Sequence, residues 1–100
     1  IDSSGLTYMC SRINGVQLPR SVEMQYKSGE VVVVTKKNKP KNGDLVFFSS
    51  DAARKDVAQV GIFIGNDEIL IASKSKCSVS VSDMNSEYFK QRLMGIRRIF

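Results

Sequence analysis

Apolar residues near the start of the chain recur at helical spacing. Four of them lie at positions i, i+3, i+4 and i+7: Leu6, Met9, Cys10 and Ile13. That spacing predicts a helix with this face buried, capped by Asp2 or Ser3 and ended at Asn14-Gly15. Ser21 is placed to cap a second, short helix that runs to about residue 27.

Beyond residue 30 the pattern changes to short β-branched and alternating runs, which are typical of strands. The expected strands are 31–35, 45–48, 58–64, 68–72, 78–82 and 94–100. The turn sequence Gly65-Asn66-Asp67 predicts a hairpin between the third and fourth of them. Val79 and Val81 share one face of the fifth, and Asp83 is placed to cap a short helix that follows. The pattern predicts an α+β fold, with helices on one side of an antiparallel sheet.

The composition limits the chemistry. The chain has 100 residues and no histidine, so Ser-His-Asp, Cys-His and HExxH sites are excluded within it. The longest apolar run, 31–34, is far shorter than the roughly 20 residues of a membrane span. We expect no cofactor, no bound metal and no membrane span. Cys10 is expected in the core and Cys77 lies before a strand; a disulfide between them stays open.

A net charge of +5 allows an anionic partner. The basic residues are scattered, apart from one cluster: Lys36, Lys37, Lys39 and Lys41. Because Pro40 lies within this cluster and Asn42-Gly43 follows it, we interpret the cluster as a solvated turn rather than a phosphate-binding patch. We expect no nucleic-acid partner, since stacking aromatic residues do not accompany the charge.

Four segments carry a family resemblance: Asp2-Ser3-Ser4-Gly5-Leu6, Leu18-Pro19-Arg20-Ser21, Gly43-Asp44-Leu45-Val46-Phe47-Phe48 and Val60-Gly61-Ile62-Phe63-Ile64-Gly65-Asn66. In this order and spacing they resemble the NlpC-type cell-wall peptidases, the bacterial papain-like family also named for the p-sixty protein. The resemblance implies a papain-like α+β fold, with N-terminal helices packed on an antiparallel sheet of about five to six strands. It also implies that residues 1–100 form a single domain without the family's N-terminal segment.

Active members of that family cleave peptidoglycan stem peptides with a Cys-His-polar triad. Their cysteine lies in an Asp-Cys-Ser-Gly-Leu motif, and their histidine directly precedes Val-Gly-Ile-Tyr-Ile-Gly. By resemblance, the three triad positions are Ser3, Gln59 and Ile71 in this chain. We therefore expect no catalytic residues and a degenerate family member that is not an enzyme. The alternative hypothesis is a cysteine-type peptidoglycan endopeptidase whose nucleophile is substituted to serine.

A binding or assembly module is the function that these substitutions favour. Arg20 is a candidate to hold a stem-peptide carboxylate, and a structural salt bridge is its alternative role. Ser4 and Gln59 are further candidate binding residues; for Gln59 the alternative is a partly exposed polar residue on a strand. Ser3 is either a residual nucleophile or a helix cap. The expected partner is a peptidoglycan stem peptide or an envelope protein, in the bacterial cell envelope or outside the cell.

Overall fold

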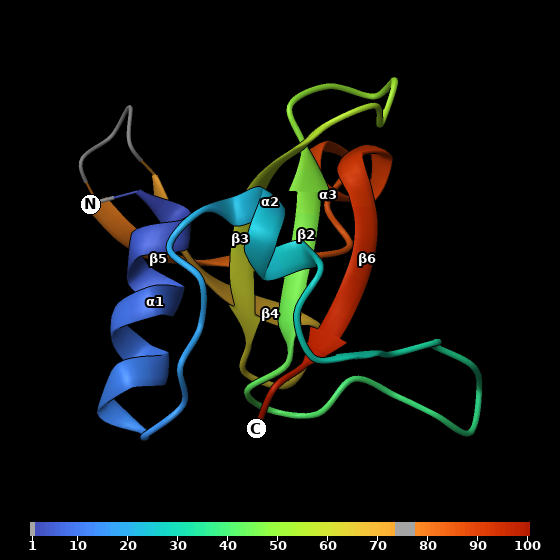
Figure 1. The fold of residues 1–100 in the computed structure, drawn as a ribbon. Helices are drawn as coiled ribbons and strands as arrows, with labels where there is room; N and C mark the ends of the chain where they lie inside the picture. Colours follow the sequence, from blue (N-terminus) through green and yellow to red (C-terminus); the bar gives the residue numbers. More distant parts are fainter. Residues whose placement is uncertain (1, 74–77) are drawn as a thin grey trace.

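The chain folds into one six-stranded antiparallel sheet with helices packed on it, in the computed structural model shown in Figure 1. The structure describes residues 2–73 and 78–100. The strand order is β1-β6-β2-β3-β4-β5. The elements, in chain order, are α1 (Ser3–Ile13), α2 (Val22–Tyr26), β1 (Glu30–Val31), β2 (Leu45–Ser49), β3 (Val57–Phe63), β4 (Glu68–Ser73), β5 (Ser78–Asp83), α3 (Glu87–Arg92) and β6 (Leu93–Arg98). The predicted fold class is confirmed.

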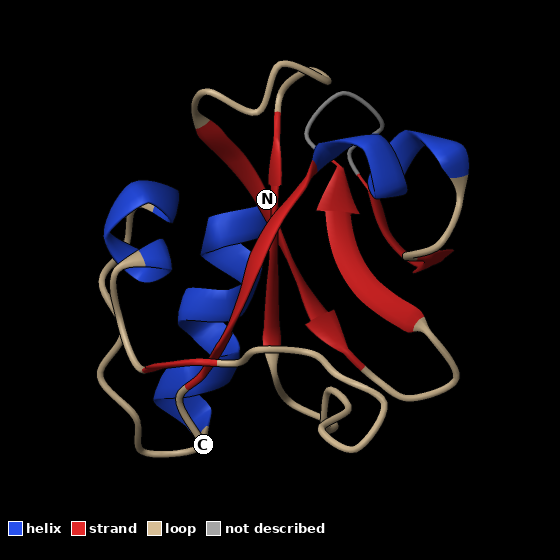
Figure 2. Cartoon of the chain, turned by 90° about the vertical axis from the view of Figure 1, so that its right-hand side faces the viewer, coloured by secondary structure: helices blue, strands red, loops and turns tan. Residues whose placement is uncertain are grey.

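Helices cover both faces of the sheet, with α1 and α2 on one side and α3 on the other (Figure 2). Alternation along β2 sends Phe47 and Phe48 to opposite faces. The Phe47 ring lies 5.1 Å from the ring of Tyr26 in α2, and the Phe48 ring lies 4.7 Å from the ring of Phe89 in α3. Each face therefore has its own apolar core, and α3 departs from the predicted one-sided arrangement.

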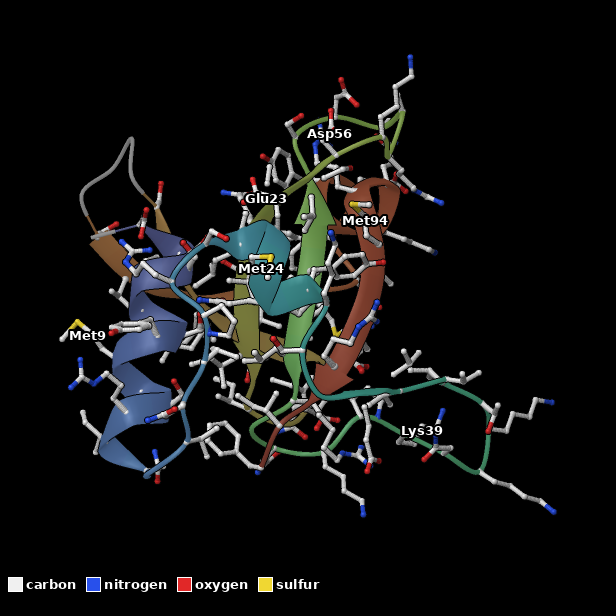
Figure 3. The ribbon with its side chains drawn as sticks, in the orientation of Figure 1. Met9, Glu23, Met24, Lys39, Asp56 and Met94 are labelled. Carbon is white, nitrogen blue, oxygen red and sulfur yellow. The ribbon has the colours of Figure 1, made fainter. Side chains whose placement is uncertain are left out.

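Helix α1 buries a face other than the predicted apolar one. Met9 is 53% exposed and Ile13 is 82% exposed, and Met9 points away from the sheet in Figure 3. The buried residues are small: Ser3, Ser4, Gly5, Thr7 and Ser11. Ser11 Oγ donates to Tyr8 O at 2.8 Å within the helix. The single hydroxyl hydrogen of Thr7 has two acceptors within reach, Ser4 O at 3.0 Å and Gln25 Oε1 of α2 at 2.6 Å. Small side chains also let the helix approach the sheet closely.

Two other predicted elements are displaced. Strand β1 holds only Glu30–Val31 rather than the predicted 31–35, although Val32 N still donates to a carbonyl of β6 at 3.0 Å. The N-cap position of α3 is Ser86, whose side chain makes no cap hydrogen bond, rather than the predicted Asp83, because Asp83 is still paired with β4 as the last residue of β5. In both places long-range strand pairing decides the boundary, and local residue preferences do not report it.

An ion pair with a buried carboxylate joins the residue before β2 to the end of β6. Arg98 Nε donates to Asp44 Oδ1 at 2.9 Å and Arg98 Nη2 donates to Asp44 Oδ2 at 2.8 Å, while Lys41 N donates to the same Oδ2 at 2.8 Å. Burial acts to raise the pKa of Asp44, but the hydrogen bonds from Arg98 and Lys41 outweigh it and hold the pKa below the ordinary 3.8. The carboxylate therefore stays ionised in the interior.

Candidate functional site

The candidate site lies where β3 and β4 separate. These strands pair only near the hairpin turn, and the pair furthest from the turn is Ile62 with Leu70. Further along β3, Val60 N donates to Ser3 Oγ at 3.2 Å instead of to a carbonyl of β4. The first turn of α1 therefore takes the place of a strand partner, and it brings Ser3 into the split between the two strands.

The N-terminus of α1 is capped by Asp2, whose carboxylate accepts from Gly5 N at 2.8 Å. This hydrogen bond is the main reason that the pKa of Asp2 is lowered, and Arg20 lowers it further, against an opposing effect of burial. Ser3 is the first helical residue and is buried, so it is not the cap. Its hydroxyl oxygen accepts the Val60 bond instead.

Gln59 and Ile71 line one cavity of about 400 Å³ between β3, β4, β5 and α3. Ile71 is buried and belongs to the apolar core that Phe48 also joins. Gln59 is partly exposed, but its Oε1 is buried and has no hydrogen-bond partner within the described part of the chain. Since Val60 is bonded to Ser3, the structure brings all three predicted triad positions to one region.

Arg20 does not line this cavity; it contacts the first turn of α1 on either side of Ser3 in the sequence. Its Nη1 donates to Ser4 Oγ at 3.0 Å, and its Nη2 donates to Asp2 Oδ1 at 3.0 Å. The Arg20 side chain is 56% exposed, so the guanidinium is reachable from solvent. The predicted salt bridge is present, and it orients the guanidinium beside the first turn of α1.

A glutamine that the sequence analysis missed holds this arrangement together. Gln25 is fully buried, and its Nε2 donates to Ser4 O at 2.9 Å and to Pro19 O at 2.8 Å. Its Oε1 accepts from Thr7 Oγ1 at 2.6 Å. The amide thus fastens the segment before α2 to the first turn of α1. The sequence does carry a signal that Gln25 is buried. It lies between Val22 and Tyr26, on the face that α2 turns to the sheet.

The remaining predicted residues lie away from the site or outside the description. Cys10 is half-buried rather than in the core, because the buried face of α1 is the one with small residues, and its thiol is free. Cys77 and its pairing lie outside the described residues. Lys39 projects from an exposed loop far from α1 (Figure 3). Across residues 2–73 and 78–100, no cluster of three or more metal-ligating side chains forms, and no helix is long and apolar enough to cross a membrane.

The chain belongs to the NlpC/P60 family, whose family model matches residues 1–98. It is 36% identical to the gamma-DL-glutamyl hydrolase of Bacillus subtilis, over 97% of this chain and 22% of that protein. It is also 36% identical to the murein DD-endopeptidase MepS/murein LD-carboxypeptidase of Escherichia coli, over 99% of this chain and 50% of that one. A crystal structure of an NlpC/P60 family protein from Bacillus cereus matches with a TM-score of 0.87 and 28% identity, over 99% of this chain and 32% of that chain.

These relatives correct the prediction that the chain is not an enzyme. That prediction is wrong by this comparison, because relatives at 36% identity are named a hydrolase and a murein peptidase. It rested on three side chains and on the absence of histidine, which exclude an imidazole-assisted mechanism within these 100 residues. Activity belongs to a whole protein, and the chain spans half or less of the length of the two curated relatives.

Proposed function

We propose that the domain binds a peptidoglycan stem peptide across the first turn of α1, between Arg20 and Gln59, in the cell envelope. The names of the relatives support this ligand class, since they act on γ-glutamyl bonds and on murein. A glutamate linked through its γ-carboxyl keeps its α-carboxylate free. A guanidinium recognises such a group with paired, charge-assisted hydrogen bonds.

Arg20 is the side chain that would hold this carboxylate. It is exposed, it is oriented by Ser4 and Asp2, and it is adjacent through Ser4 to the Ser3 position. Its bond to Asp2 leaves further guanidinium N–H groups to donate to a ligand. The ionised Asp2 limits the net positive charge at the site, so geometry rather than charge alone selects the ligand.

The proposal includes the assignment of Ser3, Gln59 and Ile71 to the three triad positions of the family. Two observations support it: Ser3 is bonded to Val60, the neighbour of Gln59, and Gln59 shares a cavity with Ile71. Substituting these positions removes an imidazole but leaves hydrogen-bonding groups along the proposed groove, which is the path from Arg20 across the first turn of α1 to Gln59. A peptide therefore still finds donors and acceptors along the path from Arg20 to Gln59.

Calorimetric titration with γ-D-glutamyl-L-lysine, together with retention on insoluble peptidoglycan, tests this function. Arg20→Met is expected to weaken binding about tenfold or more, since a hydrogen bond to a charged group is worth about 1.5–3 kcal/mol. Arg12→Met is the matched control, because Arg12 lies near the far end of α1 and contacts Tyr8. Equal loss in both variants would contradict the role of Arg20. No retention of the native domain would favour an envelope protein as the partner.

Hydrolysis at the same site is a second candidate, favoured by the identity to named peptidases and by the position of Ser3 at the start of α1. If Ser3 is the nucleophile, release of new amino groups from peptidoglycan falls to background in Ser3→Ala. A triple variant with Ser3→Cys, Gln59→His and Ile71→His provides a thiol and two imidazoles. It is expected to release amino groups at least about tenfold faster than the native chain. Equal rates in all three proteins would exclude both assignments.

A further inference from the structure

The cavity beside Gln59 differs from the Arg20 end of the proposed groove in its charge. The lining residues within 2–73 and 78–100 are all uncharged. Its walls are apolar or aromatic at Ile71, Tyr88 and Phe89, and they carry hydroxyls at Ser80 and Ser82. A charged ligand group would lose water here without gaining an opposite charge, which is costly. The cavity therefore favours a neutral group that makes hydrogen bonds.

Gln59 specifies which neutral group fits. Its Oε1 is buried and has no partner within residues 2–73 and 78–100. An unpaired buried acceptor costs about 1–3 kcal/mol, and the terminal torsion of a glutamine side chain turns over a broad range. A ligand that lets the amide turn toward the cavity and gives Oε1 an N–H donor recovers this loss. The ligand group must therefore be a hydrogen-bond donor.

We propose that this cavity recognises a carboxamide at the end of the bound peptide in preference to a free carboxylate. A primary amide both donates to Oε1 and accepts from the Gln59 –NH₂, so the two amides pair through two hydrogen bonds. A carboxylate brings only acceptors and faces Oε1 with like partial charge. An ammonium could donate, but none of the lining residues in the described part of the chain offers a carboxylate to balance its charge.

The inference rests on the proposed function, because it uses the same groove. The contacts run in sequence from Arg20 to Ser4 in the first turn, and from Ser3 to Val60 beside Gln59. A γ-glutamyl dipeptide held by Arg20 at its glutamate carboxylate would extend past Ser3 toward the cavity. The C-terminal group of its second residue is then the one that meets Gln59.

Titration of the native domain with γ-D-glutamyl-L-lysine and with its C-terminal amide tests the preference. We expect the amide to bind about tenfold tighter. The net charge of +5 would favour the more anionic free acid, so overall charge cannot produce this result. Equal affinities, or tighter binding of the acid, would overturn the inference and leave peptide binding itself intact. Failure of both peptides to bind would instead overturn the proposed function.

Gln59→Met locates the source of the preference. It keeps the length of the side chain and removes the amide, so the affinity for the peptide amide should fall to that for the acid. Gln91→Met is the matched control, since Gln91 lies on α3 and its side chain donates to Glu87 at 3.1 Å in an exposed pair. A preference that survives Gln59→Met would overturn the assignment to this cavity, and urea unfolding of both variants confirms that they are folded.

Discussion

Two glutamines in this domain lie in or beside its core, and they differ in burial and in the completeness of their hydrogen bonds. Gln25 is fully buried, and both ends of its amide are hydrogen-bonded to α1 and to the segment before α2. Gln59 is partly exposed and has a buried Oε1 without a partner in the described chain. The first fastens the segment before α2 to α1, whereas the second keeps an acceptor that the proposed ligand would pair.

The difference separates structural polar groups from recognition groups. Burying an amide is neutral for stability only when its bonds are complete, so a folded protein tolerates an incomplete one only at a cost. Such a cost is acceptable where a ligand completes the bonds. Residue type is the same for the two glutamines, whereas their burial and the completeness of their hydrogen bonds differ, and from this difference we infer different roles.

Among the substitutions considered, Gln25→Met should have the largest effect on the free energy of unfolding. Gln25→Met keeps the volume but removes all bonds of the amide and leaves Pro19 O without its side-chain donor, so the free energy of unfolding should fall by about 2–4 kcal/mol. Urea unfolding followed by circular dichroism measures it. A loss below about 1 kcal/mol would mean that water replaces the amide and that Gln25 does not fasten the groove.

Asp44 extends the comparison to a buried charged group, because both oxygens of its carboxylate accept hydrogen bonds. Asp44→Asn removes the ion pair with Arg98 and should lower the free energy of unfolding at pH 7 by about 2–3 kcal/mol. A pH series sharpens this result. Because folding lowers the pKa of Asp44, its contribution is complete well above 3.8 and is lost as the pH falls through the folded value. The native chain should therefore lose more stability between pH 5 and acid than the variant does; parallel curves would contradict the depressed pKa.

Arg20 forms an exposed ion pair with Asp2, so replacing Arg20 should have only a small effect on stability. Arg20→Met removes the bond to Asp2, but exposed ion pairs contribute about 0–1 kcal/mol, so the midpoint of urea unfolding should barely move. The same variant should lose peptide binding in the titration described above. A loss of stability as large as that of Gln25→Met would show that Arg20 is chiefly structural.

Gln59→Met completes the comparison with the smallest expected effect on stability. Removing an unpaired buried acceptor should leave the free energy of unfolding unchanged or raise it by up to about 1 kcal/mol. The measurement is the same urea series that is used for Gln25→Met. Equal destabilisation by the two substitutions would break the distinction between the glutamines and would point to a partner for Gln59 Oε1.

The sequence alone predicted the elements with strong local signals. The hairpin around Gly65-Asn66-Asp67, the β2 run and the short helix after Ser21 are all present, because turn residues, β-branched runs and caps act over a few residues. The family motifs also indicated that Ser3, Gln59 and Ile71 would lie together. Ordered motifs report a shared fold, and a shared fold fixes which positions meet.

Only the tertiary structure decided which face of α1 is buried and which polar groups are satisfied. Helical spacing finds an apolar stripe, but the buried face holds the small residues around Thr7, since they pack closely and the hydroxyls of Thr7 and Ser11 have acceptors within reach. Residue type alone cannot distinguish the two glutamines in the sequence. Their hydrogen bonds depend on atoms brought together from distant segments. A hydrogen bond requires a donor–acceptor distance that is correct to within a few tenths of an ångström, and no local sequence pattern encodes that distance.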